Sequence, residues 1–153
     1  MWGLFRCEDM DATAKNQFLW SILPGFCYVF YMVMGFSHIP RKKPYNKLFK
    51  LKTYGIHLFG SVVSSLLGVY LCQHNMPATG LFSPFVFLLT LLLADKTVQI
   101  LAGRHILIAM RGDKKPASYK WYLDGFLGFL VLFFPLISAG IALNWVRFGK
   151  WIT

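Results

Sequence analysis

Acidic side chains are scarce in this sequence of 153 residues. Six Asp and Glu stand against sixteen Lys and Arg, only one Glu is present, and charged residues make up 14% of the chain, compared with about 25% in ordinary soluble domains. Cysteine is also rare: Cys7, Cys27 and Cys72 are far apart and form neither a C-x-x-C pair nor a Cys/His spacing typical of zinc. No N-x-[ST] glycosylation sequon occurs. The sequence therefore predicts no metal site, and it lacks the convergent acids of many enzyme sites.

Long apolar runs make up much of the sequence, in which 56% of the residues are hydrophobic and 18% are aromatic. A helix needs about 20 apolar residues to cross roughly 30 Å of hydrocarbon. No strand-like alternation of apolar and polar residues is present, so helices are the predicted spanning element. We expect an all-α integral membrane protein with short loops, in which a single four-helix domain (17–147) lies between tails at 1–16 and 148–153. The four predicted transmembrane helices are 17–39, 54–72, 81–103 and 124–146.

Most of the positive charge falls in two loops between these runs. The loop after the first run, PRKKPYNKLFKLKT, holds six Lys or Arg, and the loop after the third, RHILIAMRGDKKPASYKW, holds five. The loop after the second run, QHNMPATG, holds none. Basic flanks stay on the cytoplasmic or matrix side during insertion, so both termini are predicted on the outer side. No nucleic-acid motif accompanies the charge, and nucleic acid is not a predicted partner. The first residues lack the order of a cleaved signal peptide, so targeting information is expected to be internal.

The third apolar run contains an acid beside a base, in LLLADKTVQILAGRH. Either the helix ends at Ala94 and the following residues lie on the inner surface, or it continues through Asp95 to Gly103. In a continuous helix, Asp95 must be neutral, paired or in contact with water, because an isolated carboxylate in hydrocarbon costs several kcal/mol. The predicted partners, which fall in the same inner half of the bilayer, are His57, Gln99 and Asp124. Such a network would either fix the packing of the helices or form part of a proton or ion route.

The second run carries small residues at four-residue spacing, at Gly60, Ser64 and Gly68. Small residues on one helix face allow close approach of another helix in a membrane. The sequence leaves two uses open: packing against the fourth run of the same chain, or docking to another subunit.

The inner loops mix basic and apolar residues, as in surfaces that bind anionic lipid headgroups. The predicted headgroup contacts are Arg41, Lys42, Lys43, Lys47, Lys114 and Lys115. A bound phospholipid is the only cofactor-like ligand that the sequence suggests.

Short loops, a small-residue helix face and the lack of convergent catalytic groups favour a non-catalytic accessory subunit of a multi-subunit membrane complex. It would pack against other membrane subunits and help assembly and lipid organisation. By analogy with the small accessory subunits of respiratory and ATP synthase complexes, the mitochondrial inner membrane is favoured over the endoplasmic reticulum. One alternative is a small transporter or channel subunit that uses an intramembrane Asp/His pair. A second is a small membrane-embedded lipid-modifying enzyme.

Overall fold

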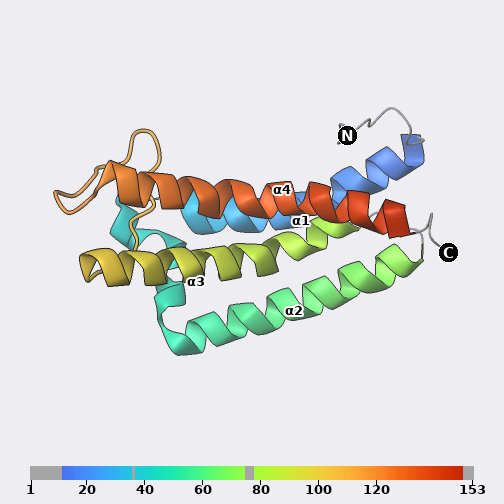
Figure 1. Cartoon of the computed structure of the whole chain (residues 1–153), viewed down its shortest axis with the longest axis horizontal. Helices are drawn as coiled ribbons and strands as arrows, with labels where there is room; N and C mark the ends of the chain where they lie inside the picture. The colour runs from blue at the N-terminus through green and yellow to red at the C-terminus, as the bar shows by residue number, and fades with distance from the viewer. Residues whose placement is uncertain (1–11, 36, 75–77, 150–153) are drawn as a thin grey trace.

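The computed structural model describes residues 12–35, 37–74 and 78–149, and these ranges contain helices and irregular segments but no strand (Figure 1). Short 3-10 helices and one π-helical turn connect four long helices. The long helices are α1 (Ala12–Met34), α2 (Leu51–Gln73), α3 (Ser83–Ala102) and α4 (Phe126–Gly149). The short elements are η2 (Pro40–Lys42), η3 (Pro44–Phe49), η4 (Thr79–Phe82) and the π-helical η5 (Trp121–Gly125).

Three segments of the described chain are long and apolar enough to cross a membrane, namely Leu51–Gln73, Thr79–Ala102 and Trp121–Ile141. A fourth apolar helical stretch, Leu19–Met34, is shorter. This pattern is compatible with an integral membrane protein, as the composition predicts. The predicted tails fall partly outside the described residues, and the described part of the first one already belongs to α1.

Glycines with positive φ end two of the helices. α1 stops at Met34, five residues before the predicted end of the first run, because Gly35 adopts φ 49° and donates its N–H to the carbonyl of Tyr31 at 3.0 Å. α3 continues through Asp95 to Ala102, where Gly103 adopts the left-handed conformation at φ 64°. The alternative in which the third helix ends at Ala94 is therefore wrong.

The core lies between α1, α3 and α4, where Val29, Val33, Phe87, Leu91 and Val131 are at most 1% exposed. α2 stands at the edge of this bundle and contacts η3, η4 and α3 (Figure 1). Only 11% of its most apolar window is buried, against 33% for the span that contains α3 and 28% for the span that contains α4. The four helices therefore form a three-helix core with one largely uncovered helix beside it.

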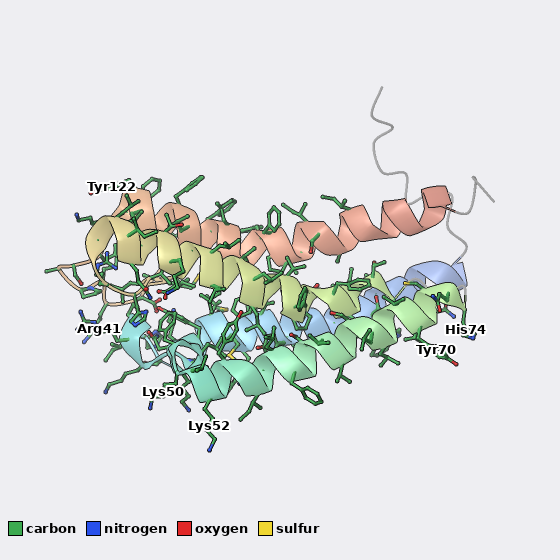
Figure 2. The ribbon with its side chains drawn as sticks, turned by 60° about the horizontal axis from the view of Figure 1, so that its bottom comes forward. Arg41, Lys50, Lys52, Tyr70, His74 and Tyr122 are labelled. Carbon is green, nitrogen blue, oxygen red and sulfur yellow. The ribbon has the colours of Figure 1, made fainter. Side chains whose placement is uncertain are left out.

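The two basic loops lie at the same end of the bundle. Figure 2 places Arg41, Lys50 and Lys52 at this end, together with Tyr122, and Tyr70 and His74 at the other. Lys114 donates its backbone N–H to the carbonyl of His38 at 2.9 Å, which ties the two loops together. We call this end, formed by residues 37–50 and 104–120, the polar end.

Candidate functional site

The centre of the polar end is a buried stretch of irregular backbone. After Gly103 the chain reverses, and residues 105–110 have no regular secondary structure. Within this return segment, Ile106, Leu107 and Ile108 are at most 4% exposed. Buried backbone N–H groups outside helices and sheets need other acceptors. Side chains from three other parts of the chain supply them.

Asp95 is the first of these acceptors. Its Oδ1 accepts the backbone N–H of Ile106 at 2.9 Å, and its Oδ2 accepts the side-chain amide of Gln99 at 2.6 Å. The imidazole Nδ1 of His105 lies 3.0 Å from the same Oδ2. Lys96 is exposed although the neighbouring Asp95 is buried, because consecutive helix residues point about 100° apart. The adjacent acid and base therefore face different surroundings and do not pair with each other.

Asp124 is the second acceptor, and its residue is 0% exposed. Both of its oxygens accept from the guanidinium of Arg104, one of them at 2.9 Å. The same carboxylate accepts the backbone N–H groups of Leu107 at 3.1 Å and Lys120 at 2.8 Å. Arg104 also donates to the carbonyl of Ser118 at 2.6 Å. The hydrogen bond to Asp124 raises the pKa of Arg104 further above its already high ordinary value, so this guanidinium is a permanent cation.

Two further acceptors complete the return segment. The phenol oxygen of Tyr45, from η3, accepts the backbone N–H of Ile108 at 2.8 Å. Burial raises the pKa of Tyr45 to about 12, so the phenol stays neutral. Asp113 accepts the backbone N–H of Met110 at 2.6 Å and forms an ion pair with Lys43.

All three carboxylates of the described residues thus bind backbone N–H groups within 104–120. We call Asp95, Asp113, Asp124 and Tyr45 the polar cap. Asp95, Asp124 and Tyr45 hold the return segment from α3, η5 and η3, and Asp113 binds its last residue, Met110, from within the loop. Fixed acceptors of this kind stabilise a conformation, and the cations beside them neutralise Asp113 and Asp124.

The predicted intramembrane network is only partly brought together. Asp95 and Gln99 are hydrogen bonded, whereas Asp124 binds Arg104 and the loop backbone. The Nδ1 of His57 lies 3.1 Å from the phenol oxygen of Tyr28 on α1. The histidine beside Asp95 is His105, which lies beyond the end of the third predicted helix and is not among the predicted partners. The turn at Gly103 reverses the chain and places His105 beside Asp95. The glycine before Arg104 is the only feature of the local sequence that indicates this reversal.

A cleft of about 310 Å³ opens beside Asp95 and His105. Its other lining residues come from η3, the start of α2 and α3, and include Phe49, Tyr54 and Leu92. The imidazole of His105 stacks on the ring of Phe49, with the centroids 4.3 Å apart and the planes tilted by 11°. The His105 side chain is 54% exposed, so the Asp95–His105 pair is open to the outside on the histidine side.

The small-residue face of α2 is divided between two surroundings. Ser64 donates to the carbonyl of Leu81 at 3.1 Å. A Cβ at Gly68 would lie 3.2 Å from the Leu81 side chain, so this end packs against η4 rather than against α4. A Cβ at Gly60 would meet nothing within 4 Å. Gly60 also borders a cleft of about 240 Å³ between α1 and α2.

Five of the six predicted headgroup residues are exposed at the polar end: Arg41, Lys42, Lys47, Lys114 and Lys115. Lys43 differs from this prediction. It is 1% exposed and its ammonium is paired with Asp113, so it is not available to a headgroup in this conformation.

No protein family, curated protein or solved structure matches this chain. Among the described residues, no group of three or more His, Cys, Asp or Glu is placed to hold a metal ion.

Proposed function

We propose that this chain is a non-catalytic accessory subunit of a multi-subunit membrane complex, and that it docks through α2. The observation that carries the proposal is the uncovered surface of α2. Ile56 is 64% exposed, Phe59 74% and Val63 50%, and they surround Gly60, whose missing side chain leaves a hollow. Small residues flanked by large apolar ones allow another membrane helix to approach closely.

The polar cap supports a structural role for the buried acids. A catalytic or transporting carboxylate must be able to change its protonation or its partner. Asp113 and Asp124 are each held by a cation and by backbone N–H groups. Their arrangement favours a device that shapes the polar end over a moving proton or ion.

The proposed topology has four spans, with the polar end on the cytoplasmic or matrix side and both termini on the opposite side. The presence of both basic loops at one end of the bundle supports this orientation. α1 would be the shortest span, because its apolar stretch begins only at Leu19. The mitochondrial inner membrane remains our preferred location over the endoplasmic reticulum, by analogy with the small accessory subunits of respiratory and ATP synthase complexes.

Gly60→Leu tests the docking surface directly. A Cβ at this position would meet no atom of the described chain within 4 Å, so the subunit itself should fold as before. It fills the hollow, however, and should release the subunit from its complex, which native gel electrophoresis after mild detergent extraction detects as a shift to the monomer plus micelle. Gly55→Leu is the matched control, since Gly55 is equally open but lies about 140° around α2 from Gly60 and does not border the cleft at Gly60.

Assembly that survives Gly60→Leu, or that Gly55→Leu disrupts equally, would overturn docking through this face. A wild-type protein that migrates as a lone monomer would overturn the subunit proposal altogether.

One observation favours the transporter or channel alternative: the Asp95–His105 pair is partly exposed in its cleft. The two proposals differ in reconstituted liposomes. An accessory subunit produces no proton or ion flux across the bilayer, whereas a flux that Asp95→Asn abolishes would favour transport.

A further inference from the structure

Another groove lies at the polar end, between the return segment and the first turns of α4. Its volume is about 500 Å³, within the range of roughly 300–1,000 Å³ common for ligand sites. Gly128 lies in its floor, where the absence of a side chain lets Ile108 pack closely. Phe129 and Leu132 continue the apolar lining along α4.

The rim of the groove is cationic. Arg111 and Lys115 both line it and both are exposed. The guanidinium of Arg111 makes no hydrogen bond or ion pair within the described chain, and the ammonium of Lys115 lies 5.3 Å from the ring centre of Tyr119. The nearest acids in sequence, Asp113 and Asp124, are already neutralised by other cations. The rim therefore carries positive charge that nothing in this part of the protein balances.

Charge and apolar surface follow one another along the axis of α4. Trp121 is 72% exposed at the start of the helical segment, as expected for a residue at the headgroup layer. Phe129 and Leu132 lie eight and eleven residues later, which places them roughly 12–17 Å deeper at 1.5 Å per residue. When α4 crosses a membrane, the rim lies at headgroup level and the floor among the acyl chains.

We propose that this groove holds one anionic diacyl phospholipid, with its phosphate between Arg111 and Lys115 and one acyl chain along Phe129 and Leu132. Two cations without a counter-ion above an apolar channel match the order of groups in such a lipid. A polar ligand would leave the floor empty, and a zwitterionic lipid such as phosphatidylcholine would bring a cation of its own to a rim that is already positive. The site lies on α4 and so does not depend on docking through α2.

Native mass spectrometry of the purified chain tests the site, with dioleoylphosphatidylglycerol and dioleoylphosphatidylcholine as the two added lipids. We expect one phosphatidylglycerol to stay bound at concentrations where phosphatidylcholine does not. Arg111→Gln and Lys115→Gln should each weaken retention about fivefold, and the double variant more strongly.

The matched control is the double variant Lys50→Gln, Lys52→Gln, at two residues that are not among the predicted headgroup contacts. It removes the same charge from the same end of the protein, from exposed residues that do not line the groove. Equal weakening by this control, or equal retention of both lipids, would show that lipid binds the polar end diffusely and would overturn the proposal. Gly60→Leu should retain the lipid unchanged, which separates this test from the test of docking.

Discussion

Removal of the Asp124 carboxylate is the perturbation that tests the polar cap most strongly. In Asp124→Ala the guanidinium of Arg104 loses its counter-ion, and the backbone N–H groups of Leu107 and Lys120 lose their acceptor. Breaking a buried ion pair by removing one partner costs about 3–5 kcal/mol. A buried N–H group without an acceptor costs about 1–3 kcal/mol, although water can reach the exposed Lys120.

We therefore expect the free energy of unfolding of Asp124→Ala to fall by about 3–5 kcal/mol. For a chain of this size, each kcal/mol lowers the melting temperature by roughly 2–4 °C. Tryptophan fluorescence during heating in mild detergent measures the change. Lys96→Met is the control, because Lys96 is exposed and its side chain bonds only to Gln99, at 3.4 Å.

A double-mutant cycle separates the ion pair from the backbone contacts. Arg104→Met combined with Asp124→Leu removes both charges, so it should destabilise less than the sum of the two single substitutions. It should still be about 1–3 kcal/mol less stable than the wild type, because Leu107 keeps an unsatisfied N–H. If Asp124→Ala loses no more stability than Lys96→Met, the carboxylate does not hold the return segment, and the structural interpretation of the cap is refuted.

Two further predictions concern other parts of the fold. Gly80→Ala should destabilise the protein by about 1–3 kcal/mol or more, because a Cβ there would lie 2.5 Å from the Cα of Ile22 in α1. Gly55→Ala, in open space within α2, should not destabilise the protein in the same thermal assay, because alanine favours a helix over glycine. An equal loss of stability in both variants would contradict the close contact of η4 with α1. Burial raises the pKa of Tyr45 from 10.0 to about 12, so the stability that its neutral phenol contributes is fully present below pH 10 and is lost as the pH rises to about 12. The difference between the tyrosinate absorbance titrations of wild type and Tyr45→Phe should have its midpoint near pH 12, with circular dichroism to check folding, and a midpoint near pH 10 would show that this phenol is not buried.

Much of the helical architecture could be predicted from the sequence, because hydropathy and length act locally. The runs at 54–72 and 81–103 lie close to α2 and α3, and an uninterrupted apolar stretch leaves few alternatives to a helix. The charge pattern of the loops also predicted that residues 40–53 and 104–121 share one end of the bundle. The positions of Arg41, Lys50 and Lys52 in Figure 2 and the Lys43–Asp113 pair are consistent with this prediction. The end of α1 was missed, because Gly35 stops the helix inside an apolar run.

The partners of the polar residues could not be predicted in the same way. Depth along a helix suggested His57 as the neighbour of Asp95, but two residues at similar depth meet only if their helix faces turn toward each other. The positive φ of Gly103 reverses the chain and brings His105 and the N–H of Ile106 to Asp95 instead. In the same way, the sequence predicts that Lys43 is a surface cation, whereas the fold pairs it with Asp113.

Composition and spacing by themselves determined that the chain forms long apolar helices with cationic connections, because each helix satisfies its own backbone hydrogen bonds. Only the tertiary structure decided which acids hold the return segment, which cations remain free beside α4 and which face of α2 stays uncovered. Those outcomes depend on contacts between residues far apart in the chain. The pattern within each segment does not determine how the helices are rotated relative to one another, and this rotation decides which residues meet.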